Sequence, residues 1–243
     1  MSDPDLLRIA YKKLSTNKGA LTPGPYGDTP DGFSEEKIQI ISKKILNGTY
    51  TWSPIKRIMI PKPGKTTKRP LGIPEFTDKL IQETIRMTLE SIYEPHFNNI
   101  NCNSGFRPNR DCAYAIRKIR QKAQFATQVI EGDIVGAYNN VNHPILMKLL
   151  SKRIKDKKFL KLLWNGLKSG IIENNSFTDS FLGVPQGGIC SPIIFNIYMH
   201  EFDLFMLTFN SELSKIEPVG PKVTTEYARL KSRRTRLINK IKN

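Results

Sequence analysis

The sequence of 243 residues carries a formal net charge of +16 at pH 7, and 39% of its residues are hydrophobic. This length is sufficient for one large domain or two small ones. Such an excess of positive charge favours a polyanionic partner, with nucleic acid considered first and an acidic membrane surface second. No run of about 18 apolar residues occurs, so no segment is expected to span a bilayer.

Cysteine, histidine and the first residues exclude further classes. The three cysteines form no CxxC pair and the chain has only three histidines, so no zinc site is expected. The cysteines are expected to be ordinary small apolar residues of a protein in a reducing compartment. The first twenty residues contain early acidic residues and no apolar core, which argues against a secretory signal and a typical transit peptide.

Hydrophobic spacing predicts a chain in which helices alternate with short strands. The helical pattern and its capping residues predict helices over 6–14, 35–46, 77–89, 111–123, 144–150, 156–170 and from 192 onward. Alternating or β-branched runs predict strands over 55–60 and 128–135 and a strand pair within 171–184. Residues 17–33, crowded with Gly, Pro and Asp, are expected to form an irregular loop.

Asp133 is the first candidate for chemistry. It lies near the end of QVIEGDIV, an apolar, β-branched run that predicts a buried strand. An unpaired acid is costly to bury, and binding Mg²⁺ through a hard oxygen ligand is one way to offset that cost. The alternative is an ion pair with one of the many arginines, and Asp133 taken alone favours that alternative.

The residues after Asp133 favour a nucleotide site. Gly136 would let the backbone approach a triphosphate closely. An aromatic ring at Tyr138 would crowd the sugar and leave no room for a 2′-hydroxyl, which selects deoxynucleotides. Taken alone, Tyr138 is better explained as a core aromatic.

A basic stretch and a glycine-rich corner add candidate contacts. Lys62, Lys65, Lys68 and Arg69 lie in a proline-stiffened stretch that could clamp phosphates during phosphoryl transfer, with a solvated basic loop as the alternative. In VPQGGICSP, a rigid corner would hold the amide of Gln186 while glycines leave space beside it for a base and sugar. Gly187 is the first of these glycines. As a lone motif, PQG fits any tight turn.

Together these segments resemble reverse transcriptases of the group II intron maturase type. The matching blocks are, in chain order, NKGALTPG, IPKPGKTTKRPLGIPEFTDKLIQE, LESIYEPHFNNINCNSGFRPNRDCAYAI, EGDIVGAYNNVNHPILMKLL and GVPQGGICSPIIFNIYMHEFD. The resemblance implies that Asp133 is the first metal-binding aspartate and that Gln186 is the nucleotide-contacting glutamine. It runs from about residue 17 to the end of the sequence.

The sequence departs from the family pattern at one decisive place. The family's next block carries a Tyr-x-Asp-Asp turn, which supplies the remaining carboxylates that hold two metal ions, and this sequence contains no Asp-Asp pair. The acids after Ser191 lie in no suitable turn and are Glu201, Asp203, Glu212, Glu217 and Glu226. Smaller departures are Val135, where a lysine is frequent, and Asn139, where an aspartate is frequent. The basic tail resembles the start of the insertion that precedes the missing block.

The resemblance implies an α+β fold, the fingers and incomplete palm of a right-hand polymerase, with an antiparallel sheet and packed helices. The expected divisions are an N-terminal extension over 1–48, fingers over 49–127, a partial palm over 128–210 and a basic tail over 211–243. Mg²⁺ is the expected cofactor, but only if the site is completed. RNA contacts are expected from Lys18, Lys56, Arg57, Arg107, Arg110, Arg229, Arg233, Arg234 and Arg236.

Three functional hypotheses follow. In the first, the chain is a fingers and palm fragment that is inactive alone and performs RNA-directed DNA synthesis only with a second polypeptide. In the second, it is a non-catalytic RNA-binding component of a ribonucleoprotein, for intron splicing or in an assembly of the mitochondrial ribosome type. The third is a degenerate fragment without function. A mitochondrial, organelle-encoded origin is expected, with the bacterial cytoplasm as the alternative and no membrane partner.

Overall fold

The computed structural model describes residues 1–243 apart from 65, 124–125, 127–128, 214–224 and 243. Two units are present, Met1–Leu204 and Phe205–Asn243. The elements are α1 (Pro4–Ser15), α2 (Glu35–Asn47), β1 (Ile55–Pro61), β2 (Lys68–Ile73), α3 (Phe76–Ile100), α4 (Cys112–Ala123), the 3₁₀ helix η1 (Ala137–Asn140), α5 (His143–Ser151), α6 (Lys157–Leu167), β3 (Ile171–Glu173), β4 (Ser176–Thr178), α7 (Ser191–Leu213) and α8 (Thr225–Lys242).

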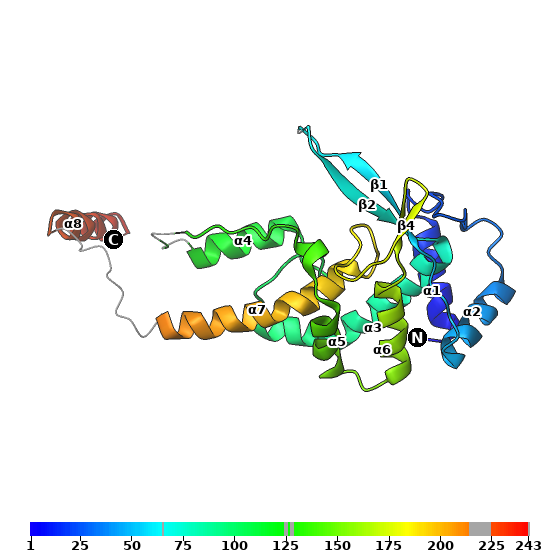
Figure 1. Ribbon diagram of the computed structural model, residues 1–243. Coiled ribbons are helices and arrows are strands. Elements are labelled where there is room, and N and C mark those ends of the chain that lie inside the picture. The colour runs from blue at the N-terminus through cyan, green and yellow to red at the C-terminus, as the bar shows by residue number, and fades with distance from the viewer. Residues whose placement is uncertain (65, 124–125, 127–128, 214–224, 243) are drawn as a thin grey trace. The chain divides into compact units, whose positions relative to one another are not determined.

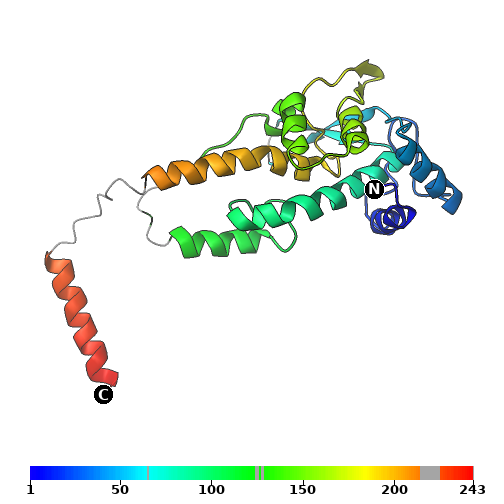
Figure 2. The same ribbon diagram turned by 90° about the horizontal axis from the view of Figure 1, so that it is seen from below.

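Helix α3 runs through the centre of the first unit, beside α7 (Figures 1 and 2). Its residues Leu80, Ile81, Ile85 and Leu89 are at most 1% exposed, and they join one buried cluster with side chains of α1, α2, α5, α6 and α7. Because α3 is covered on several sides, it also buries polar residues such as Gln82. Burial of this cluster is the dominant favourable contribution to folding.

The sheet lies at one end of this helical core and has the strand order β2-β1-β3-β4. Strands β1 and β2 form an antiparallel hairpin in which Ile58 pairs with Leu71, and β3 and β4 form a second, shorter hairpin. The two hairpins join through a parallel pairing of Ile55 with Ile171. The expected α+β fold is confirmed, but this central pairing is parallel where an antiparallel sheet was expected.

Capping residues in the sequence correctly predicted where α2 and α6 begin. Ser34 caps α2 by accepting a hydrogen bond from the backbone N–H of Lys37, and Gly48 ends it at a φ of +71°. Asp156 starts α6, as predicted, because its carboxylate accepts from the N–H groups of Lys158 and Phe159. Within the described residues, no helix has both the length and the apolar character needed to cross a membrane.

The predicted strand over 128–135 is wrong for its described part. Residues 129–134 have no regular secondary structure, residue 128 lies outside the described residues, and Val129 and Ile130 are 85% and 99% exposed. A strand gains its hydrogen bonds and its burial only from a neighbouring strand. No described strand lies beside this segment, so its β-branched composition alone does not give it a regular conformation.

Candidate nucleotide and nucleic-acid site

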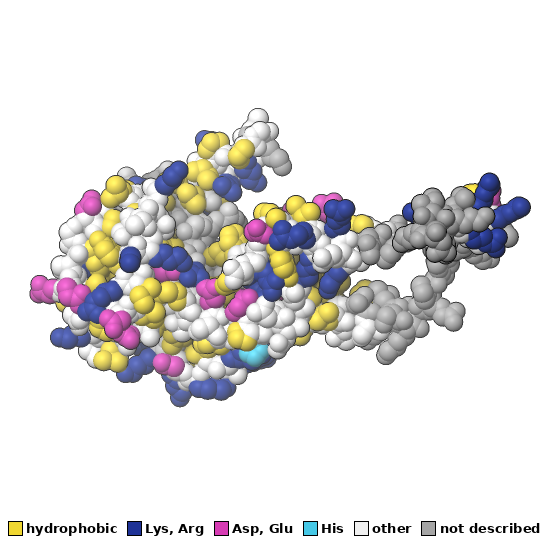
Figure 3. Space-filling view, turned by 180° about the vertical axis from the view of Figure 1, so that it is seen from behind, with side chains coloured by type: hydrophobic (Ala, Val, Ile, Leu, Met, Phe, Trp, Pro, Cys, Tyr) yellow, Lys and Arg dark blue, Asp and Glu magenta, His cyan; other side chains and the backbone are white. Residues whose placement is uncertain are grey.

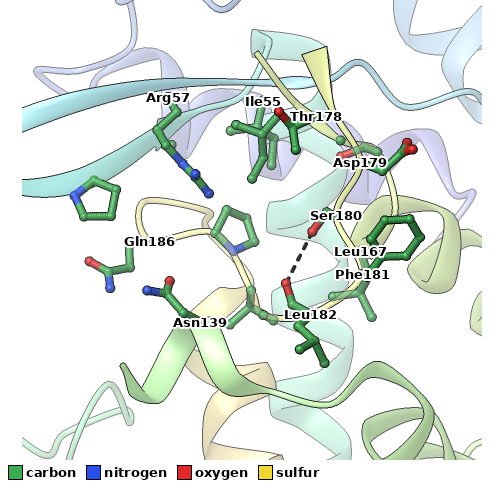
Figure 4. A pocket seen from close by; sticks show the side chains of 18 of the residues that line it. Ile55, Arg57, Asn139, Leu167, Thr178, Asp179, Ser180, Phe181, Leu182 and Gln186 are labelled. Carbon is green, nitrogen blue, oxygen red and sulfur yellow. Dashed lines mark hydrogen bonds between the residues drawn. The ribbon is translucent and has the colours of Figure 1, made fainter. Parts of the chain in front are cut away.

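A cavity of 330 Å³ lies between the base of the β1–β2 hairpin, η1 and the segment that leads into Gln186. In Figure 4, Arg57 of β1 and Asn139 of η1 reach toward the turn that carries Gln186 from opposite sides. The rest of the wall comes from Thr178 at the end of β4, from Asp179 and the residues that follow it, and from the segment that joins α6 to β3. The cavity therefore joins the basic hairpin with the glycine-rich corner, two segments that lie more than a hundred residues apart.

Gln186 is held against strand β2. Its carbonyl oxygen accepts a hydrogen bond of 2.6 Å from the backbone N–H of Gly72. The next residue, Gly187, has a φ of +106°, and a Cβ there would lie 2.6 Å from the Gly72 carbonyl oxygen. Only glycine satisfies both conditions without strain, so this corner depends on Gly187.

The segment before Gln186 is anchored to η1. The N–H of Val184 donates to the carbonyl oxygen of Tyr138, and the N–H of Gly183 donates to that of Val141, both at 2.8 Å. The Gly183 carbonyl oxygen lies 2.7 Å from Nε2 of His143, which is fully buried. Because a carbonyl only accepts, Nε2 of His143 carries the proton.

A third anchor comes from α3. The side-chain oxygen of Gln82 accepts a hydrogen bond of 2.8 Å from the N–H of Ile189, two residues beyond Gly187. Gln82 is 5% exposed, and a buried polar side chain is stable only when it is bonded in this way. Sequence reasoning missed Gln82, although a polar residue within the apolar run LIQE was the signal that could have found it.

Tyr138 is held by the core instead of facing this cavity. Its ring stacks on Phe195 of α7, with centroids 4.7 Å apart and an interplanar angle of 18°. Tyr138 is half-buried, and its neighbour Asn139 is the residue of η1 that lines the cavity. The core explanation therefore accounts for the ring as it stands, and a steric role toward a sugar stays a prediction.

Asp133 lies in the exposed irregular segment before η1. It is not among the residues that line the cavity of Figure 4. Gly136 follows with a φ of +61°, and its carbonyl accepts from the N–H groups of Asn139 and Asn140. Glycine is thus required for the turn that opens η1, which is a local reason for Gly136 in addition to the predicted approach of a triphosphate.

The described residues do not by themselves fit a two-metal site. Among them, no group of three or more His, Cys, Asp or Glu side chains is arranged to hold a metal ion. A symmetric clamp on the attacking and leaving oxygens needs ligands from two sides. Asp133 is the predicted ligand on one side, and that role stays a prediction.

The basic hairpin presents its cations to solvent. Lys56, Lys62, Lys68 and Arg69 are exposed, whereas Arg57 is half-buried and lies 3.7 Å from Glu173. Figure 3 shows Lys and Arg side chains along the protruding hairpin. Lys65 lies outside the described residues. These positions are compatible with a phosphate-contacting surface, and Arg57 is the member that lines the cavity.

Arg107 requires a correction. Its side chain is completely buried and donates two hydrogen bonds, of 2.8 and 3.1 Å, to the carboxylate of Glu94, as well as others to Asn98 and Asn103. A guanidinium whose donors are used in this way is not available to RNA, because a buried Arg must stay paired. Arg107 is therefore a structural residue.

The other predicted RNA contacts are exposed, apart from Arg110, which is half-buried. Lys18 is exposed in the turn that follows α1, and Arg110 lies over the ring of Tyr114 at 4.2 Å. In the second unit, α8 exposes Arg229, Arg233, Arg234 and Arg236. Their role in RNA binding remains a prediction.

Known protein sequences are similar to this chain over most of its length. Residues 60–213 match the family described as reverse transcriptase (RNA-dependent DNA polymerase). The group II intron-encoded protein LtrA of Lactococcus lactis subsp. cremoris is 43% identical over 239 residues, which cover 98% of this chain and 39% of LtrA. An uncharacterized 91 kDa protein in the cob intron of Schizosaccharomyces pombe is 40% identical over 226 residues, covering 93% and 28%.

The fold is also similar to that of a solved structure. A solved structure titled partial Cas6-RT-Cas1–Cas2 complex matches with a TM-score of 0.53 and 18% identity, covering 85% of this chain and 34% of that one. At this identity the likeness supports the polymerase fingers and palm fold alone. The chain spans about two fifths of the length of LtrA. By its family match and its identity to these relatives, the chain belongs to the group II intron reverse transcriptase/maturase family.

Proposed function

We propose that this chain binds RNA as the fingers and partial palm of a group II intron reverse transcriptase, and that it synthesises DNA only when another polypeptide completes the active site. The observation that carries this proposal is that one side of the candidate site is fixed by the fold and the other is not. The corner of Gln186 is fixed by backbone bonds to β2 and η1, whereas Asp133 lies in an exposed segment with no described carboxylate cluster around it.

The surroundings of Asp133 support the need for a partner. Val129, Ile130, Ile134 and Val135 are 85%, 99%, 51% and 87% exposed. Exposed apolar, β-branched segments are a liability that another strand or chain relieves. A partner that pairs with this segment and brings a Tyr-x-Asp-Asp turn would cover these residues and supply carboxylates opposite Asp133.

Primer extension on an RNA template tests the proposal. We expect no extension by the purified chain alone, extension when a second polypeptide with the Tyr-x-Asp-Asp turn is added, and its loss with Asp133→Ala. Asp31→Ala, which removes an exposed carboxylate elsewhere, is the control and should leave activity unchanged. Strong extension by the lone chain that Asp133→Ala abolishes would falsify the half-site argument.

A second candidate function is RNA binding without catalysis, as part of a ribonucleoprotein or in intron splicing. The exposed cations of the hairpin and of α8 favour it, because phosphate contacts alone supply affinity. Reconstitution that never yields DNA, combined with RNA binding that is unaffected by Asp133→Ala, is the outcome that selects this function.

A mitochondrial, organelle-encoded origin is the localisation we propose, with the bacterial cytoplasm as the alternative.

A further inference from the structure

A second cavity, of 510 Å³, lies far along α3 from the corner of Gln186. Its walls come from the C-terminal half of α3, the turn after α5 and the middle of α7, all within the first unit. Two of the three histidines of the sequence, His96 and His200, line it together with Tyr93, Lys152, Arg153 and Glu201. None of these residues contributes to the nucleotide site described above.

The polar groups of this cavity are mainly hydrogen-bond donors. Arg153 donates through Nη1 to Nε2 of His96 at 2.7 Å. Because a guanidinium has no acceptor, Nε2 of His96 must be the unprotonated nitrogen, and the imidazole proton lies on Nδ1. No ion pair of Arg153 occurs among the described residues, so its charge is not neutralised by a carboxylate.

The nearby acidic side chains do not neutralise the charge of Arg153. Glu201 lines the cavity, but its carboxylate is already paired with Lys152 at 2.9 Å. Asp203 acts electrostatically on His200 but is not among the lining residues. Partial burial lowers the pKa of His200, with Arg153 and His96 adding to that effect and Asp203 and Glu201 opposing it.

Tyr93 gives an independent indication of a missing hydrogen-bond partner. It is 3% exposed and lines the cavity, and its hydroxyl has no hydrogen-bond partner among the described residues. Burial raises the pKa of Tyr93 and the charge of Arg153 opposes this rise, so the two groups act on the same region. Buried hydroxyls are normally bonded to protein or to a ligand.

We propose that the cavity formed by Tyr93, His96, Arg153 and His200 binds a phosphate group. A guanidinium binds phosphate through paired, charge-assisted hydrogen bonds, and imidazole and hydroxyl donors complete the shell of such an anion. The C-termini of α3 and α5 lie close by, but the effect of an exposed helix terminus is weaker than a charge-assisted bond. The phosphate can belong to an RNA backbone or be a free ion.

Nuclear magnetic resonance of the histidine rings tests this site directly. The chain has three histidines, and His143, bonded to the Gly183 carbonyl, is an internal control remote from this cavity. With inorganic phosphate added to the intact chain at constant pH and ionic strength, we expect saturable shifts of the His96 and His200 resonances and none of His143. Linear shifts without saturation would overturn the proposal.

Matched variants separate a built site from general attraction of anions. Arg153→Gln is expected to weaken phosphate binding at least tenfold, whereas Arg117→Gln, at an exposed residue of α4 with the same change in charge, leaves it unchanged. An unaltered His143 resonance shows that each variant is folded. Equal weakening by both variants contradicts the proposal.

A competition arm identifies the source of the phosphate. Displacement of inorganic phosphate by a single-stranded RNA oligonucleotide assigns the site to an RNA backbone, and phosphate binding that RNA does not affect assigns it to a free anion. The site does not depend on the proposed polymerase function, because inorganic phosphate is the probe. Failure of primer extension therefore leaves it standing.

Discussion

Gly187 shows how one residue fixes the candidate nucleotide site. It has a positive φ and comes so close to β2 that a Cβ would contact the Gly72 carbonyl oxygen at 2.6 Å. Neither property depends on the chemistry of the site. They determine instead where the amide of Gln186 can lie, since the carbonyl of that residue bonds to the same Gly72.

Gly187→Ala is therefore expected to lower the free energy of unfolding by about 2 kcal/mol, because the new methyl group must displace β2 and alanine is strained at this positive φ. Chemical denaturation measures this change. Gly105→Ala is the control, since a Cβ at Gly105 meets nothing within 4 Å, and it should change stability by less than about 0.5 kcal/mol. Equal effects of the two variants would contradict the role given to Gly187.

Asp78 predicts a dependence of stability on pH. It is 1% exposed and accepts hydrogen bonds from the Tyr50 hydroxyl at 2.6 Å and from the Ser53 N–H at 3.1 Å. Burial raises the pKa of Asp78 from 3.8 to about 6. Between these values Asp78 binds more protons in the folded chain than in the unfolded chain, so its contribution to stability falls as the pH rises from about 4 to about 6.

Asp78→Asn removes this titration. We expect the stability of the parent to fall relative to that of the variant between pH 4 and pH 6.5, by an amount on the order of 2 kcal/mol, in denaturation curves recorded across that range. Asp31→Asn alters an exposed carboxylate and should keep the slope of the parent. The same change of stability with pH in the parent and in the Asp78 variant would contradict the role given to Asp78.

At the scale of elements, the β1–β2 hairpin connects the corner of Gln186 with the exposed basic residues of the candidate site. One end of the hairpin bonds to the corner of Gln186 through Gly72, and Arg57 lines the shared cavity. Its outer part carries exposed Lys62, Lys68 and Arg69 without an ion pair among the described residues. A nucleic acid bound along the hairpin would thus reach the cavity directly.

Replacing Lys62, Lys68 and Arg69 with Gln is expected to weaken binding of single-stranded RNA. The magnitude of the slope of log K against log salt is expected to fall by about 2, because binding with fewer phosphate contacts releases fewer counterions. Titrations at several salt concentrations measure the slope. Replacing the exposed Lys43, Lys44 and Lys161 makes the same change in charge elsewhere. The same loss of slope in both triple variants would mean that net charge alone governs binding.

At the scale of the whole molecule, the exposed segment before η1 is where a partner is expected. Ile130 is 99% exposed, so it contributes almost nothing to the folded chain as described. Covering its apolar surface with another chain would lower the free energy of the assembly.

Ile130→Asn is expected to leave the free energy of unfolding within about 0.5 kcal/mol of the parent and to weaken association with the completing polypeptide in a pull-down or sedimentation experiment. Leu46→Asn, at an apolar residue of α2 that is 58% exposed, is the control and should not alter association. Unchanged association in the Ile130 variant would remove this segment from the interface.

The sequence by itself determined the family, most of the helices of the first unit and the glycine-rich corner that carries Gln186. Helices follow from local caps and from spacing within one segment, so Asp156 and Ser34 began theirs as predicted or nearly so. The tertiary structure decided what depends on distant neighbours. It packed Tyr138 on Phe195, paired Arg107 with Glu94, and placed Gln82 behind the corner of Gln186.

The irregular conformation of residues 129–134 has the same cause. Their composition favours a strand, but a strand needs backbone partners and a covered face, which are supplied by other parts of a fold. The parallel pairing of β1 with β3 likewise joins segments more than a hundred residues apart. Local chemistry selects conformations along the chain, and only contacts between remote segments decide which side chains are buried, paired or left exposed.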